Sequence, residues 1–311
     1  MTSRYRLIDT GFDPATTGAL QPDENAFRIR DRLTDNEYRH LAGILAQRPD
    51  AWLWLEDRSP DIECLAHFPG LRRLMVTSLR LESWAGLRHV AASLEDLGMG
   101  DGTLKRISIA PMADLSTIRS LTILGPVRDA DVIGALTTLE ELALRSVTLS
   151  DLSPLVGLPR LHSLGLLLGG TANLGRLPEI AGLRDLELWQ IRGLRDVSIL
   201  GALPRLQKLT LQSMSGVSAL PSFANLPELR RVALDTMKGI TDLQPVADAP
   251  SLEELLLIGM PQLAAESLRP LVGHPSLKRG IWGFGSRRKN AAAYDLLPIA
   301  DPPYGHPDWQ A

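Results

Sequence analysis

The chain has 311 residues, of which 44% are hydrophobic and 22% charged, a composition typical of a soluble globular protein. Its length allows two ordinary domains or one array of repeats. A formal net charge of −3 offers no basic surface of the kind that nucleic acid requires, so no nucleic-acid partner is expected.

The N-terminal sequence, the hydropathy and the cysteine content bear on the cellular compartment. The charged N-terminus carries no signal peptide pattern, and no apolar stretch reaches the length of a membrane span. Cys64 is the single cysteine, which excludes an intrachain disulfide and a cysteine-based metal cage. We therefore expect a cytoplasmic protein that does not bind a membrane.

The first predicted element is a helix near the N-terminus. Thr34 and Glu37 have the spacing of a capping box, and the apolar Leu41, Ile44 and Leu45 follow at helical intervals. This pattern predicts a helix of about three turns. It would form part of an N-terminal cap over residues 1–49.

A phrase of the form LxxLxL then recurs along most of the chain, at steps of 21 to 25 residues. An additional degenerate copy begins at Asp50, and the last copy has Gly280 in place of its second leucine. Such a period predicts a solenoid of about 11 units over residues 50–283. Residues 284–311 are expected to be a C-terminal cap and tail. The regular copies begin at Leu71, Leu94, Ile118, Leu139, Leu161, Leu183, Leu206, Leu229, Leu252 and Leu277.

Each unit predicts a strand followed by a returning segment. Positions are counted from the first residue of the phrase, so that Leu206 is position one of its copy. The apolar residues at positions four and six, such as Leu209 and Leu211, alternate with the period of a half-buried strand. After the strand, apolar residues recur every three positions, as at Met214 and Val217, which favours 3₁₀ or extended structure. The segment Leu104–Ile109 also matches the phrase out of step, and we interpret it as the return of the Leu94 unit.

These copies, for example Leu139–Arg160, resemble the leucine-rich repeat family in its short bacterial, internalin-like form. The resemblance covers about three quarters of the chain. It implies an α/β repeat solenoid, a horseshoe with a parallel concave β-sheet, an irregular or 3₁₀ convex side and a helical N-terminal cap. One departure is position nine, where apolar residues such as Met214 and Met237 replace the usual Asn or Cys.

No motif for catalysis, cofactor binding or metal binding is present. We therefore assign no catalytic residue, no cofactor and no metal, and we expect a protein that is not an enzyme. The alternative is a substrate-recognition subunit of an enzyme complex, or a cryptic enzyme around Tyr5–Asp50.

The variable positions three, five and seven should face the concave side of the sheet. Trp189 near Leu167 and Arg145, with Arg231 and Asp235 two coils further on, has the composition of an interface centre. A second apolar group includes Leu256 and Ile258, which the C-terminal tail would alternatively cover. Trp52 and Trp54 are expected to be held by the N-terminal cap. The predicted partner-binding residues are Arg145, Leu167, Asp185, Glu187, Trp189, Lys208, Gln212, Arg231, Asp235, Leu256 and Ile258.

The leading hypothesis is therefore a monomeric adaptor, regulator or immunity-type protein that binds another protein through its concave face. The identity of that protein is not encoded in the pattern.

Overall fold

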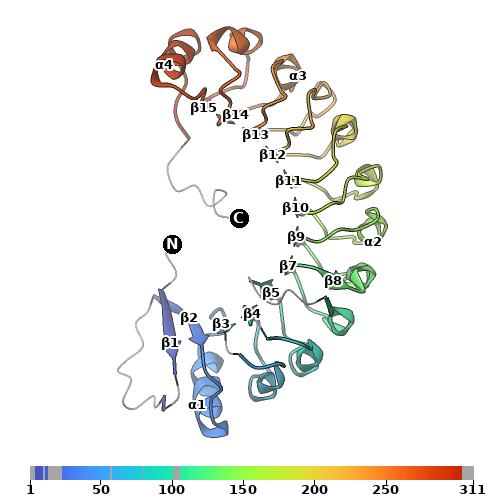
Figure 1. Ribbon diagram of the computed structural model, residues 1–311, viewed down its shortest axis with the longest axis vertical. Helices are drawn as coiled ribbons and strands as arrows, with labels where there is room; N and C mark the ends of the chain where they lie inside the picture. Colours follow the sequence, from blue (N-terminus) through green and yellow to red (C-terminus); the bar gives the residue numbers. More distant parts are fainter. Residues whose placement is uncertain are drawn as a thin grey trace. The chain divides into compact units, whose positions relative to one another are not determined.

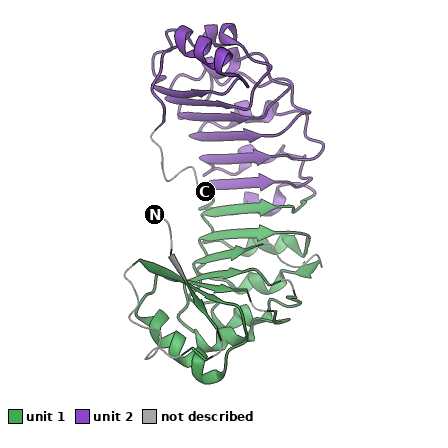
Figure 2. Cartoon of the chain, turned by 60° about the vertical axis from the view of Figure 1, so that its left-hand side comes forward, with its two compact units in different colours: residues 1–149, 157–161 green, residues 150–156, 162–311 purple. Residues whose placement is uncertain are grey.

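A computed structural model describes residues 4–9, 11–12, 23–56, 58–78, 80–100 and 106–302. The chain divides into two compact units, coloured green and purple in Figure 2. The first unit comprises residues 1–149 and 157–161, and the second comprises residues 150–156 and 162–311. Both are built from parallel strands that pair in chain order (Figure 1).

The strands of the first unit begin with two that the repeat phrase does not predict. β1 and β2 pair in parallel, and β2 places Phe27 and Ile29 beside Leu53 and Leu55 of β3. A pair of short strands, β6 and β8, forms a separate two-stranded sheet, so Ile107 and Ser108 of the out-of-step segment lie outside the repeat sheet. Leu104 and Lys105 of that segment lie outside the described residues. The first-unit strands are β1 (Arg4–Ile8), β2 (Glu24–Ile29), β3 (Trp52–Leu55), β4 (Arg73–Val76), β5 (Asp96–Met99), β6 (Ile107–Ser108), β7 (Ser120–Leu124), β8 (Val127–Arg128) and β9 (Glu141–Arg145).

Strands β10 to β14 of the second unit coincide with positions three to seven of their copies, as predicted, and β15 with positions three to six. Their register aligns equal positions, so that Leu186 lies beside Leu209 and Leu188 beside Leu211. The leucines at positions four and six are buried along the whole series. These strands are β10 (Ser163–Leu167), β11 (Asp185–Trp189), β12 (Lys208–Gln212), β13 (Arg231–Asp235), β14 (Glu254–Ile258) and β15 (Arg279–Trp282).

The returning segments contain mostly 3₁₀ turns, which confirms the prediction from the spacing of three. Apolar residues at position nine, including Met214, Met237 and Met260, are buried where relatives of the resembled family carry a polar residue. The 3₁₀ helices are η1 (Glu63–His67), η2 (Ala85–His89), η3 (Ala110–Asp114), η4 (Ala130–Ala135), η5 (Leu177–Glu179), η6 (Ser198–Ala202) and η7 (Ala265–Leu271), with short α-helices α2 (Ser153–Val156) and α3 (Gln244–Ala247).

Position eight ends strands β7 and β9 to β14 by adopting a left-handed backbone conformation. The N–H of Leu168 donates to the carbonyl of Trp189 at 2.7 Å, and that of Gln190 to Gln212 at 2.8 Å. The chain therefore turns away from the sheet at the same point in successive units. The residues with this conformation at position eight are Gly125, Ser146, Leu168, Gln190, Ser213, Thr236 and Gly259.

The two caps close the ends of the leucine core. Helix α1 (Asp35–Ala46) carries the predicted capping box, with Glu37 accepting from the backbone N–H of Thr34 at 2.7 Å. Helix α4 (Arg287–Leu296) follows the last strand, and Trp282 donates its indole N–H to the carbonyl of Leu297 at 3.2 Å. The tail residues Tyr304 and Trp309 lie outside the described residues. No helix among the described residues is long and apolar enough to span a membrane.

Candidate functional site

The side of each sheet that carries positions three, five and seven is here called the variable face. In the second unit the parallel register places these positions in three columns across β10 to β15. The columns gather side chains that are not repeated from copy to copy. They are therefore the part of the sheet where recognition can differ while the leucine frame stays the same.

Position three is a column of charges that pair with one another. Lys208 Nζ lies 3.7 Å from Asp185 Oδ2, and Arg231 Nε lies 3.0 Å from Glu254 Oε1. Arg279 Nε is 3.2 Å from the other oxygen of Glu254, an ion pair without the geometry of a hydrogen bond. Asp185, Lys208 and Arg231, predicted as partner contacts, are thus already neutralised within the chain.

Position seven carries the most interface-like side chains of the second unit. Leu167 of β10 lies directly beside Trp189 of β11, and both are half-buried. Gln212, Asp235 and Ile258 continue the column and are also half-buried. An aromatic side chain beside an aliphatic one on a strand face is the kind of surface that protein partners use.

Glu187, at position five, is a half-buried carboxylate that has no hydrogen bond or ion pair with any of the residues described above. Its register neighbours are Gly165, which has no side chain, and Thr210. Burial raises the pKa of the Glu187 carboxyl, since removing the charged form from water is unfavourable. Glu187 shares its strand with Trp189, two residues on and therefore on the same face.

Two of the predicted partner contacts, Leu256 and Arg145, differ from the others in burial or in the unit to which they belong. Leu256 is only 1% exposed, so it presents little surface in this structure, and its contact with a partner stays a prediction. It lies between Ala233 and Ile281 in the sheet, and Ala233 is buried as well. Arg145 is exposed on β9 of the first unit, whereas the other predicted contacts belong to the second.

The variable face of the first unit contains a group that sequence reasoning mostly missed. Trp54 is covered by the guanidinium of Arg28 at 4.2 Å and donates its indole N–H to Thr77 Oγ1 at 2.8 Å. Arg28 lies on β2, within residues 1–49, so Trp54 is held by the N-terminal cap as expected. Glu56 accepts from both Arg28 and Arg30, and these hydrogen bonds, chiefly that from Arg28, lower its pKa.

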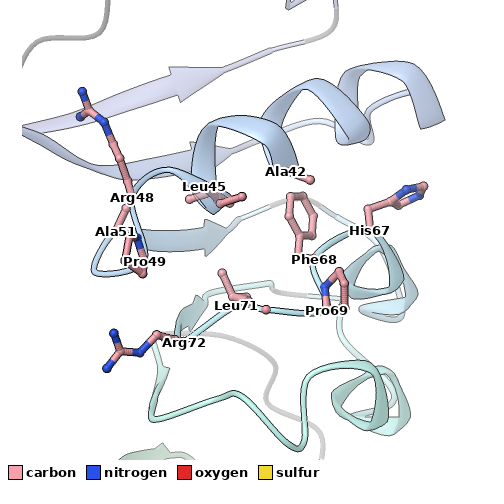
Figure 3. Close-up of a pocket in the computed structure, with 12 residues that line it drawn as sticks. Ala42, Leu45, Arg48, Pro49, Ala51, His67, Phe68, Pro69, Leu71 and Arg72 are labelled. Atoms are coloured by element: carbon pink, nitrogen blue, oxygen red, sulfur yellow. The ribbon is translucent and has the colours of Figure 1, made fainter.

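An apolar cavity of about 270 Å³ lies beneath α1 (Figure 3). Phe68 points toward Ala42 and Leu45 of α1, while the guanidinium groups of Arg48 and Arg72 extend away from the cavity. This cavity is the seam between the cap helix and the first repeats, and its lining offers few polar groups for recognition.

No protein-family model matches the chain, and no curated protein matches it in sequence. Among solved structures it is similar to an internalin (InlF) from Listeria monocytogenes, with 18% identity, a TM-score of 0.61, and coverage of 89% of this chain and 78% of that one. It also matches an internalin C2 from the same organism, with 24% identity, a TM-score of 0.45, and coverage of 60% of this chain and 78% of that chain. We base the assignment of fold on InlF.

The spaced leucines, the strand register within each unit and the 3₁₀ returning segments agree with this similarity. Together they show that the chain has the leucine-rich repeat solenoid fold, in a form similar to that of the internalins.

Proposed function

We propose that this chain is a non-enzymatic module that binds another protein through the variable face of its second unit. The observation that carries the proposal is the pairing of half-buried Leu167 and Trp189 on neighbouring strands, with Glu187 on the same face. A few well-packed side chains near the centre of a patch, among which Trp is enriched, provide most of the binding free energy in protein interfaces.

Glu187 also indicates the charge expected of the partner. A half-buried carboxylate without a counter-charge is unfavourable in the free protein, and an interface would exclude still more water from it. A basic side chain from the partner would relieve that penalty. We therefore expect the partner to present Lys or Arg to Glu187 and an apolar surface to Trp189.

The role as a cytoplasmic adaptor, regulator or immunity-type protein is part of the same proposal. It is supported by the scarcity of cysteine and by the absence of a catalytic motif in the sequence.

The test is affinity capture from native lysate followed by mass spectrometry, comparing wild type with Trp189→Ala and Leu167→Ala. Recovery of the specific partner should fall about tenfold or more, because truncating a central aromatic contact typically costs 2 kcal/mol or more. Arg205→Ala, at an exposed site in a returning segment of the same unit, is the matched control and should recover the partner normally. Unchanged recovery by both face variants would exclude this face as the binding site.

A further inference from the structure

A polar cavity in the first unit has a charge imbalance that the proposed protein-binding face does not explain. It measures about 990 Å³ and lies where β2, β3 and β4 end. Its lining includes three arginines, Arg30, Arg32 and Arg58, and two carboxylates, Asp31 and Glu56. A cavity of this size lies in the range of small-molecule sites, roughly 300–1,000 Å³.

The contacts of Glu56 show that it does not neutralise this cluster. Its single charge is shared between Arg28, which donates from Nε at 2.6 Å, and Arg30, which donates at 3.1 Å. Arg28 also stacks on Trp54, which fixes its position. With Arg28 included, the described groups around the cavity carry an excess of two positive charges.

Arg32 and Arg58 are the groups available to a ligand. Both are exposed, both line the cavity, and neither makes a hydrogen bond or ion pair with a residue that the structure describes. Thr77 adds a neutral donor, because its oxygen accepts from Trp54 while its own hydroxyl proton has no acceptor among the described residues.

We propose that this cavity binds a phosphate group, with Arg32 and Arg58 as its cationic contacts and the Thr77 hydroxyl as an additional donor. Guanidinium groups form paired hydrogen bonds with phosphate oxygens, and a phosphate dianion matches two unpaired guanidiniums in charge. A carboxylate has one charge and two oxygens, so it would leave part of this donor set unused. The phosphate could belong to a nucleotide or to a phosphorylated side chain, and this inference does not depend on the protein-binding face.

The test is isothermal titration calorimetry of the full chain with three probes. These are ADP, an alanine-flanked phosphoserine peptide, and the same peptide with glutamate in place of phosphoserine. Saturable binding of ADP or of the phosphopeptide, in preference to the glutamate peptide, is expected. ADP alone would identify a nucleotide, and the phosphopeptide alone a phosphorylated protein.

Variants make the assignment specific. Replacing both Arg32→Ala and Arg58→Ala should weaken binding at least about tenfold, because each charge-assisted hydrogen bond contributes substantially to affinity. Arg32→Lys with Arg58→Lys should retain part of the affinity, since charge is kept and the forked geometry is lost. Arg128→Ala, at an exposed arginine on β8, is the control. Circular dichroism checks that each variant is folded.

Three results would overturn the proposal. The first is no binding of either phosphate probe at concentrations up to about 10 mM, where even weak affinities are detectable. The second is equal binding of the glutamate peptide. The third is unchanged binding by the double alanine variant.

Discussion

Glu187 is the residue whose environment most clearly departs from that of its counterparts in other copies. The position-three carboxylates of the second-unit sheet have cationic neighbours: Asp185 has Lys208, and Glu254 has Arg231 and Arg279. Glu187 has none in the part of the chain that the structure describes, and Gly165 and Thr210 beside it are uncharged. Its charge therefore lowers the stability of the free protein, which is a common property of residues kept for binding.

This gives a prediction about pH. Because the pKa of Glu187 is raised in the folded chain, the unfolded chain ionises first as the pH rises. The stability associated with this group is fully present below the unfolded pKa of about 4.3 and is lost as the pH rises through the folded pKa. Glu187→Gln should therefore raise the Tm at pH 7 and leave it nearly unchanged at pH 3.

Thermal unfolding followed by circular dichroism at the two pH values measures this difference. Glu266→Gln, at an exposed glutamate of η7 in the same unit, is the control and should match wild type at both. A Tm for Glu187→Gln at or below that of wild type at pH 7 would show that the carboxylate has a stabilising partner.

At the scale of an element, strand β15 explains why the last copy departs from the repeat. Gly280 occupies position four, where other copies have a leucine or similar residue. The ring of Trp282 from position six covers this position, so a Cβ on Gly280 would lie 2.8 Å from Trp282 Cη2 and 3.0 Å from the Leu255 carbonyl. One indole thus fills the space of two side chains at the end of the core.

Gly280→Ala should accordingly destabilise the chain by about 1–3 kcal/mol, since overpacking a tight site displaces its neighbours. Denaturation with urea, monitored by circular dichroism, measures the change. Gly43→Ala is the comparison, because a Cβ there meets nothing within 4 Å and alanine favours the α1 helix. If Gly280→Ala were as stable as Gly43→Ala, the contact with Trp282 would not be what requires glycine.

For the whole molecule, the sheet edges decide whether copies of the chain associate. At the C-terminal end, the N–H of Gly280 donates to the carbonyl of Ala300 at 3.0 Å, and Arg279 pairs with Ala300 as a parallel bridge. The chain that follows α4 therefore covers part of the β15 edge, as native sheets commonly do to prevent edge-to-edge pairing.

We accordingly predict that the chain is a monomer. Size-exclusion chromatography with light scattering should give 34.0 kDa over a broad concentration range. Repeating the measurement at high salt separates charge-driven association from strand pairing, since salt screens only the former. A mass that doubles with concentration at both salt levels would contradict the prediction and direct attention to the other terminal strand, β1.

The repeat period, the strand positions and the capping box of α1 could all be predicted from the sequence. Each depends on residues close together in the chain, such as the alternation of Leu209 and Leu211 or the spacing of Thr34 and Glu37. The role of β2 was missed because the phrase does not extend to it, although Phe27 and Ile29 do alternate with polar residues.

The sequence by itself determined which residues form the buried leucine core and which residues lie at positions three, five and seven of each strand, because both follow from short-range periodicity. Only the tertiary structure decided which column members are available to a partner. It pairs Lys208 with Asp185, buries Leu256 and gathers Arg32 with Arg58 at one cavity. It also leaves Glu187 without a counter-charge among the residues it describes. The physical reason is that burial and charge pairing depend on neighbours about one full repeat away or more, and on side-chain directions that no local pattern encodes.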